Sequence, residues 1–314
     1  MRRVWYTELM TLHTYTIARN DAGQRLDRFL AKQGLTVGVV RKALRNKDIK
    51  VDGKRVSADY KLIAGEEIRV YLQSEIQAVA AKKPRFYGVS VKLDIVYEDE
   101  NLLLVNKPVG LLCHEDDSGN PDTLINRIKA YLAKQENETD YSALCNRIDR
   151  NTCGIVIAAK NAETLREMND KIKNRELTKL YLCILVGIPK EREATLTSFM
   201  EKDEATNTVK VFKTKPANAP NVKTAITKYR VLETRGNLAL AEVNLITGRT
   251  HQIRAHMASI GCPLLGDGKY GRAAVNKSYG FANKQALCSY KLILDGRTHE
   301  VRDIWFLERF RELQ

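Results

Sequence analysis

The sequence predicts an α+β protein, in which a mixed, largely antiparallel sheet flanked by helices follows a small α/β module. Strand-type segments outnumber helical ones in the later part of the chain and come in successive runs, which argues against a doubly wound sheet. The length of 314 residues suits two domains. We expect the small module at residues 1–75, a linker of weak periodicity at 76–91 and the larger domain at 92–314.

The small module is predicted to contain a helix pair followed by strands. A first helix is capped by Asn20 or Asp21, and Thr36 caps a second one. In the segment IKVDGKRV, the dipeptide Asp52-Gly53 predicts a two-residue hairpin turn. The residues expected to face the core of the module are Leu26, Phe29 and Leu30, then Val40, Ala43 and Leu44, and finally Ile68, Val70 and Leu72 of the strand EEIRVYL.

The chain is strongly basic, with a net charge of +14 and a pI of about 9.4. Residues 1–75 carry 15 Lys and Arg against 9 Asp and Glu, which makes this module the more basic part per residue. Because this charge is not explained by a low-complexity basic tail, it indicates that the protein binds a polyanionic partner. We expect nucleic acid rather than an anionic membrane, since no clear basic amphipathic surface helix is present.

Seven of these cations are candidate RNA-binding residues. They belong to the outward side of the second helix, the loop after it and the predicted hairpin: Arg41, Lys42, Arg45, Lys47, Lys50, Lys54 and Arg55. A basic helix face is by itself most often an ordinary solvated surface. Because three successive elements are basic together, we favour a surface that contacts phosphates.

The stretches RLDRFLAKQG, VRKALRNKDIKVDGKRV and AGEEIRVYL, at about residues 24–73, resemble the S-four RNA-binding domain, also called the alpha-L motif. The resemblance implies that the helix pair and the loop after it dock on structured RNA.

From Lys92 onward the pattern is mainly that of strands. LDIVYEDENLLLVNKP predicts a strand, a charged turn and another strand, and GIVIAAKN predicts a short buried strand. LTKLYLCILVG, TAITKYRVLE and LALAEVNLI predict further strands. Two helices are expected, NAETLREMNDKIKN with Leu165, Met168 and Ile172 on one side, and THQIRAHMASIG with Ile253, Met257 and Ile260 inward and Gly261 after its end.

Several classes of protein are disfavoured. The six cysteines form no C-x-x-C pair, which is typical of reduced thiols in a cytoplasmic protein. The histidines show no metal-ligand spacing, with His251 and His256 five residues apart, so we expect no zinc. No apolar run reaches ~18 residues, so we expect no membrane span. Nothing indicates an obligate partner subunit, and we expect a monomer.

A first candidate for chemistry is the segment NRIDRNTCGIVIAA, which places Asp149 between two arginines. If this segment is extended, Arg147 and Asp149 project to the same side. A neighbouring guanidinium favours the ionised form of a carboxylate, and an ionised, partly desolvated carboxylate can act as a nucleophile or base. Thr152 and Gly154 suggest a tight bend that would hold it in place. A structural Asp–Arg pair that closes a loop is an equally good interpretation of these residues alone.

A second candidate is the segment TGRTHQIRAHMASIGCPLLGDGKYG, in which Arg249, His251, Arg254 and His256 lie close together. Arg254 is expected on the second turn of the helix, one residue off its inward face, from which it could reach a buried acid through a bidentate contact. The alternative is a basic helix that faces solvent. The glycines of this segment match neither G-x-G-x-x-G nor a Walker pattern.

A third candidate is Tyr181, in the strand LTKLYLCILVG. A tyrosine in such a strand is most often part of the core. The sharper hypothesis is a platform on which a base stacks, with a hydroxyl at its edge.

Together, NRIDRNTCG, TKLYLCILVG and GRTHQIRAHMASIGCPLLGDGKYG resemble the three signature segments of the RluA-type ribosomal pseudouridine synthases, in their RluC/RluD-like branch. NKPVGLLCH matches the opening strand and turn of that family, so the resemblance extends from about Asp94 to Phe306. The first motif of the family is usually H-R-L-D-x-x-T-S-G, and Asn146, Ile148 and Cys153 depart from it here.

The resemblance implies an RNA pseudouridine synthase, with a catalytic domain at residues 92–314. Asp149 would be the catalytic aspartate, Arg254 its salt-bridge partner, and Tyr181 would stack on the uracil and could assist proton removal. Arg147 would help to hold the flipped nucleotide and Ile253 would line the base pocket, whereas His251 would support the fold. The reaction detaches uracil, turns it and reattaches it through carbon, which needs no cofactor. The branch favours large-subunit ribosomal RNA as substrate and leaves transfer RNA open, as well as a glycal or a covalent route.

Other functions fit the sequence less well. A base deaminase needs a zinc motif with P-C-x-x-C, which the sequence lacks. A retaining glycosidase needs two carboxylates, and no second acid is obvious near Asp149 in sequence. A non-enzymatic RNA-binding or ribosome-assembly factor on the same fold is the serious alternative, but the presence of Asp149, Tyr181 and Arg254 argues against it.

Overall fold

The computed structural model describes residues 10–35, 37–73, 88–116, 118–135, 141–217, 219–282 and 284–312. The chain divides into two compact units, Met1–Tyr87 and Gly88–Gln314, and each is described by itself. Most of the predicted linker at 76–91 lies outside the described residues, as does the predicted cap Thr36. The predicted domain boundaries therefore stay a prediction.

The smaller unit contains an antiparallel sheet with the strand order β1-β3-β2. Its elements are β1 (Met10–Thr16), α1 (Leu26–Lys32), α2 (Val37–Asn46), β2 (Ile49–Val51) and β3 (Glu67–Gln73). Eight of the nine residues predicted to face the core are buried, and the ninth, Leu44, is partly buried and packs against them. The inward faces predicted for this unit are thus confirmed.

One local prediction for the smaller unit is wrong, and another is confirmed only in part. The first helix begins at Leu26 with Arg25 at its N-cap, whereas Asn20 and Asp21 lie in a separate 3-10 turn. Asp52-Gly53 does form a turn with positive φ angles, but the segment after it makes a single bridge and no strand. Strand β2 pairs instead with β3, in antiparallel orientation.

The larger unit contains an 11-stranded sheet among its described residues. The strands follow in the order β10 (Thr208–Phe212), β9 (Glu193–Asp203), β11 (Lys223–Arg235), β12 (Leu238–Leu245), β8 (Thr178–Val186), β13 (Leu287–Leu294), β7 (Cys153–Ala159), β5 (Leu102–Lys107) and β4 (Ile95–Glu98), with β14 (Arg297–Glu300) beside β13 and β6 (Ala143–Leu144) beside β7. The pair β13 and β7 is parallel and the other pairs are antiparallel. The prediction of a mixed, largely antiparallel sheet is confirmed.

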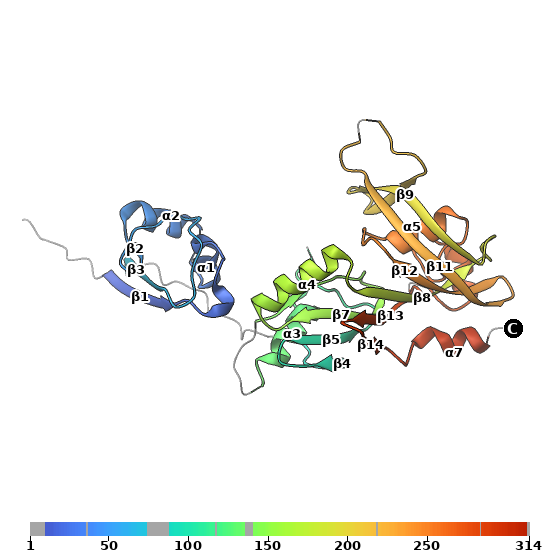
Figure 1. The fold of residues 1–314 in the computed structure, drawn as a ribbon, viewed down its shortest axis with the longest axis horizontal. Helices are drawn as coiled ribbons and strands as arrows, with labels where there is room; N and C mark the ends of the chain where they lie inside the picture. The colour runs from blue at the N-terminus through green and yellow to red at the C-terminus, as the bar shows by residue number, and fades with distance from the viewer. Residues whose placement is uncertain are drawn as a thin grey trace, which may run out of the picture. The chain divides into compact units, whose positions relative to one another are not determined.

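Helices cover the sheet of the larger unit and form two cores with it. Alternate residues of β5 and β7, such as Leu103 and Val156, pack with α3 (Leu124–Leu132) and α5 (Gln252–Ser259). Their neighbours Leu104, Ile155 and Ile157 pack with α4 (Ala162–Asn174) and α7 (Trp305–Glu312). Because β7 is buried on both faces, its sequence is apolar throughout. Figure 1 shows α4 beside β7 and α5 beside β11.

The prediction that Ile260 faces the core of this unit is wrong. Ile260 was expected to face inward with Ile253 and Met257, but its exposed fraction is 36%. The helix α5 ends at Ser259, so residue 260 leaves the helical repeat before it can reach the core. The sequence patterns also gave no prediction for α3, for α6 (Ala273–Ser278), or for α7 and β13, although the last two supply much of one core.

A close approach of strands β7 and β13 lies next to the segment that contains Asp149. Ser289 of β13 is the register partner of both Gly154 of β7 and Tyr181 of β8. Gly154 has a φ angle of 108°, and a Cβ atom added to it would lie 2.3 Å from the carbonyl oxygen of Ser289. A glycine is therefore required here, and it lets the sheet bring the start of β7 close to Tyr181.

Substitution of Gly154 by alanine is expected to lower the free energy of unfolding by about 3 kcal/mol or more, because the added methyl group meets backbone and the φ angle is unfavourable for it. Urea denaturation of the full chain would measure this. Gly248→Ala is the matched control, since its Cβ atom meets nothing within 4 Å. Equal stabilities of the two variants would contradict the proposed close approach.

Candidate active site

A cavity in the larger unit collects residues from segments far apart in the sequence. It has about 370 Å³ of space free of protein atoms, part of it open to solvent. The lining residues are Arg147, Ile148, Asp149, Thr152, Tyr181, Leu245, Arg249, His251, Gln252, Ile253, Arg254 and Leu287. All five residues predicted for catalysis and substrate binding in this unit are among them. The seven candidate RNA-binding cations lie in the smaller unit, where six are exposed and Lys50 is partly buried.

Asp149 lies in the loop between β6 and β7, and backbone contacts hold this loop. The fully buried Lys107 donates through Nζ to the carbonyl oxygens of Pro108, Leu111 and Arg150, at 2.8, 2.8 and 3.0 Å. The N–H of Thr152 donates to the carbonyl oxygen of Asp149 and so closes the tight bend that was predicted. Burial lowers the pKa of Lys107 to about 8, with the charge of Asp149 among the opposing effects. The carboxylate thus stands on a fixed backbone.

Arg254 connects two carboxylates. Its Nη1 donates to Oδ2 of Asp149 at 2.8 Å, while Nε and Nη2 donate to the two carboxylate oxygens of Asp267 at 2.6 and 2.8 Å. The side chain of Asp267 is completely buried, that of Arg254 is 8% exposed, and that of Asp149 is 29% exposed. The bidentate contact with Asp267 fixes the guanidinium plane. Its remaining nitrogen then fixes the position of Asp149.

The ionised forms of Arg254 and Asp267 stabilise each other. Burial alone would lower the pKa of Arg254, but the hydrogen bonds and charge of Asp267, together with the charge of Asp149, outweigh burial and raise it. For Asp267, burial alone would raise the pKa, and the hydrogen bonds from Arg254 and from the N–H groups of Lys269 and Tyr270 lower it. A permanent cation therefore faces Asp149.

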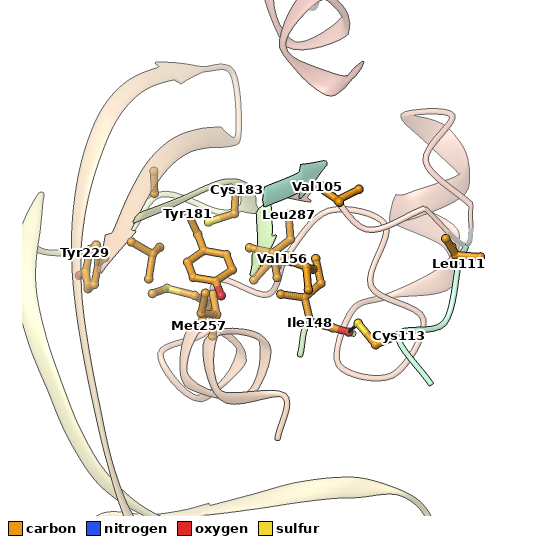
Figure 2. Close-up of a cluster of buried hydrophobic side chains, with 14 of the residues drawn as sticks. Val105, Leu111, Cys113, Ile148, Val156, Tyr181, Cys183, Tyr229, Met257 and Leu287 are labelled. Carbon is orange, nitrogen blue, oxygen red and sulfur yellow. Dashed lines mark hydrogen bonds between the residues drawn. The ribbon is translucent and has the colours of Figure 1, made fainter. Parts of the chain in front are cut away.

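Tyr181 forms part of the cavity wall and is only 5% exposed. Figure 2 shows its ring among Ile148, Met257 and Leu287. Burial raises the pKa of Tyr181 to about 12, with a contribution from the charge of Asp149. The hydroxyl group of Tyr181 is protonated at neutral pH as a result. The hydroxyl group is therefore suited to donate a hydrogen bond rather than to accept a proton.

The start of α5 forms another side of the cavity. Gln252 accepts hydrogen bonds from Thr247 and from the N–H of Arg249, and it donates to Ile226 and Thr227. This network holds the turn before the helix against strand β11.

His251 lies at the N-cap of α5 with a φ angle of 50°. Its Nδ1 contacts the hydroxyl of Tyr270 at 3.0 Å, and its Nε2 lies 4.0 Å from Oδ2 of Asp149. Burial lowers its pKa, and the charge of Asp149 only partly opposes this. His251 was predicted to support the fold, and the structure also places it on the cavity wall.

Several residues of the site were not predicted. Lys107, Gln252 and Leu287 gave no signal in the sequence, although each contacts a segment distant in the chain. Asp267 had one, since it is the single acidic residue in TGRTHQIRAHMASIGCPLLGDGKYG, the segment in which Arg254 was expected to reach a buried acid. Among the described residues, no group of three or more His, Cys, Asp or Glu could hold a metal ion. No helix in the same part of the chain is long and apolar enough to cross a membrane.

Comparisons with known proteins agree with this architecture. The family model described as RNA pseudouridylate synthase matches residues 101–259. The chain is 32% identical over 257 residues to ribosomal large subunit pseudouridine synthase C of Rickettsia bellii, covering 79% of this chain and 82% of that protein. It is 34% identical over 268 residues to ribosomal large subunit pseudouridine synthase D of Haemophilus ducreyi, covering 84% of this chain and 78% of that protein.

A solved structure, that of human RNA pseudouridylate synthase domain containing 1, matches with a TM-score of 0.54 and 26% identity, over 68% of this chain and 84% of that one. The chain therefore belongs to the RNA pseudouridine synthase family, and it is an enzyme of that class. The resemblance to the RluA-type enzymes is confirmed, whereas the resemblance of residues 24–73 to the S-four domain stays a prediction.

The helix α5 is anchored through a second histidine on its buried side. His256 is 1% exposed, and its ring nitrogens contact the hydroxyl groups of Thr227 and Ser198 at 2.7 and 2.6 Å. Burial lowers its pKa to about 4. Protonation of this ring in the folded protein is thus disfavoured.

The free energy of unfolding should fall as the pH is lowered from 7 to 5. Below pH ~6.5 the unfolded chain binds a proton at His256 that the folded chain does not accept until about pH 4, so this residue should remove about 2 kcal/mol between pH 7 and pH 5. Urea denaturation of the wild type and His256→Gln at both pH values would show a steeper loss for the wild type. Parallel losses would rule out this contribution. The carboxylate of Asp267 does not interfere, since its lowered pKa places its titration at lower pH.

Proposed function

We propose that this enzyme converts uridine to pseudouridine in large-subunit ribosomal RNA, with Asp149 as the single catalytic carboxylate. The observation that carries the proposal is the contact of Arg254 with Asp149 on the wall of a cavity that Tyr181 also lines. The choice of RNA rests on the names of the relatives, which are ribosomal large subunit pseudouridine synthases. For such a substrate the protein would act in the cytoplasm, and we propose that it acts as a monomer without a cofactor.

In the proposed reaction the bond between N1 of uracil and C1′ of the ribose breaks and a bond from C5 to C1′ forms. C5 loses a proton and N1 gains one, so the product is an isomer of the substrate. Asp149 would attack C1′ or remove a proton from the sugar. Arg254 and Asp267 would hold this carboxylate in place and keep water from competing for it. Both routes require the uridine to leave its stack, because its glycosidic bond is otherwise out of reach.

The other lining residues have roles that follow from their chemistry. Tyr181 would stack on the uracil, and Ile253 would contact the base from the side. The high pKa of Tyr181 favours a hydrogen bond from its hydroxyl over the proton removal that the resemblance suggested. Arg147 is exposed at the cavity and would contact the flipped nucleotide or occupy the place it leaves.

The smaller unit would be an S-four-type RNA-binding domain. Its exposed cations Arg41, Lys42 and Arg45 lie on α2, and Lys54 and Arg55 follow the Asp52-Gly53 turn. Contacts of these side chains with phosphates would stabilise the complex without reading sequence. Unstacking a base costs a few kcal/mol, and such contacts would offset that cost.

Replacement of Asp149 by asparagine should abolish pseudouridine formation, since the neutral amide can neither attack the sugar nor accept its proton. RNA affinity should stay within about tenfold, because phosphate contacts dominate binding. Carbodiimide modification followed by primer extension would map pseudouridine in ribosomal RNA from cells with and without the gene, complemented by each variant. The exposed Asp303→Asn is the matched control. If no uridine depends on the gene, ribosomal RNA is the wrong substrate; an active Asp149→Asn would rule out the catalytic role.

Neutralising Arg41, Lys42 and Arg45 together with glutamine should weaken RNA binding and flatten its salt dependence. The logarithmic slope should fall by about 0.9 for each phosphate that the variant no longer neutralises. Filter binding of ribosomal RNA between low and moderate salt would give the slopes. Arg28 and Lys61 are exposed cations outside the candidate set, and their glutamine variants serve as controls. A slope unchanged from that of the controls would count against this surface.

A further inference from the structure

A second cavity adjoins the candidate active site in the larger unit. It has about 1000 Å³ of space free of protein atoms, which includes open solvent, and it shares Arg147 and Leu245 with the first cavity. Its walls come from the loop before β7, from the end of α4 and the start of β8, and from the turn after β12. Anything bound in it would be a direct neighbour of a nucleoside in the first cavity.

The second cavity is lined by cations without acids. Arg147, Arg175 and Lys179 contribute to its walls, and no Asp or Glu among the described residues does. Within the described residues, none of the three side chains has an ion pair or a hydrogen-bond acceptor. Arg147 and Arg175 are exposed and Lys179 is partly buried, whereas Lys160, another partly buried lysine of this unit, is paired with Glu98. The unpaired charges are thus available to an anion from outside.

Lys179 differs from the other two cations in its partial burial and in its position on the strand of Tyr181. It is partly buried and precedes Tyr181 by two residues on the same strand, so the two side chains belong to the same face of β8. Burial lowers the pKa of Lys179, and no acid compensates it. An ammonium group that has lost part of its hydration gains more from an anionic ligand than an exposed one does.

Asn146, which also lines the second cavity, and the position of Arg175 bear on the same question. Asn146 accepts a hydrogen bond from the N–H of Ile157 through Oδ1, at 2.8 Å, while its Nδ2 is buried without an acceptor among the described residues. A buried amide donor is normally satisfied, and this one lacks a partner beside the second cavity. Arg175 follows the last residue of α4 with a φ angle of 62°, where glycine is the usual residue. That an arginine occupies this position favours a role for its side chain.

We propose that the second cavity binds a phosphodiester group of the RNA strand beside the flipped uridine, through Lys179 and Arg175, with Arg147 between the two cavities. The proposal rests on the proposed function and extends it to the neighbouring nucleotide. The strand that delivers a uridine to the first cavity continues on both sides of it, so a phosphate must pass close to Arg147. Binding that phosphate would hold the strand in the opened conformation and offset part of the cost of unstacking.

The first test uses Lys179→Gln in the full-length protein with in vitro transcribed large-subunit ribosomal RNA. KM should rise about tenfold, as expected when one charge-assisted hydrogen bond is removed. The value of kcat should stay within about twofold, because Lys179 does not touch the reacting atoms. The slope of log affinity against log salt should fall by about 0.7–0.9. Lys179→Arg should retain most of the affinity, and the exposed Lys277→Gln is the matched control.

The second test locates the phosphate. An RNA fragment that contains the target uridine is synthesised with one uncharged methylphosphonate at a time on either side of it. At the bound position, this replacement should weaken binding to the wild type about tenfold and should not weaken binding to Lys179→Gln further, because the two changes remove the same interaction. Additive effects at every position, or a Lys179→Gln slope equal to that of Lys277→Gln, would overturn the proposal.

The two proposals fail in different ways. A wild-type protein that binds the transcript but modifies no uridine would refute the proposed substrate, and the salt slope of Lys179→Gln would still test the phosphate contact. Melting temperatures of the variants exclude misfolding as the cause of weak binding.

Discussion

The geometry of the candidate site depends on one buried ion pair, that of Arg254 with Asp267. Removing both charges from water costs several kcal/mol per ion, which only good geometry and additional hydrogen bonds can return. Here both carboxylate oxygens of Asp267 meet the guanidinium, and two backbone N–H groups donate to Oδ1. The guanidinium has a single orientation as a result, and that orientation leaves Nη1 pointing at Asp149. A residue that no substrate needs to touch thereby determines where the proposed catalytic oxygen lies.

The sheet provides the second constraint, because it sets the distance between the acid and the aromatic ring. Tyr181, Ser289 and Gly154 are register partners across three adjacent strands. Because Gly154 has no side chain, β7 can approach the backbone of Ser289 closely. The bend from Asp149 to Thr152 leads directly into this strand. Lys107 connects this loop to the segment after β5, because its Nζ donates to the carbonyl oxygens of Pro108, Leu111 and Arg150. Cavity shape is therefore a consequence of strand pairing rather than of loop sequence.

Sequence patterns predicted the parts of this fold in which burial repeats regularly. They failed where the end of a helix or a contact with a distant segment determines whether a residue is buried. The alternation in EEIRVYL and the apolar run of β7 were sufficient, because each strand buries the same residues whatever its neighbour is. Ile260 fits the helical repeat but lies past the end of α5, which depends on the turn at Gly261. The resemblance supplied Asp149 and Arg254 as a pair. The contact with Asp267 requires the backbone to reverse between residues 260 and 267, which periodicity does not encode.

Two kinds of cation lie around the candidate site, and their burial and pairing separate their proposed roles. Arg254 is almost fully buried between two acids, so its charge is neutralised in the free protein. It therefore fixes the position of Asp149 rather than adding to the affinity for RNA. Arg147, Arg175 and Lys179 have no acid, so their charge acts on whatever enters the two cavities. The proposed extraction of a base from a folded RNA requires both kinds of cation. A cation that is already neutralised cannot offset the free-energy cost of unstacking, and an unpaired cation cannot fix the position of a carboxylate. In the proposed complex, the backbone of the RNA passes the unpaired cations that line the second cavity.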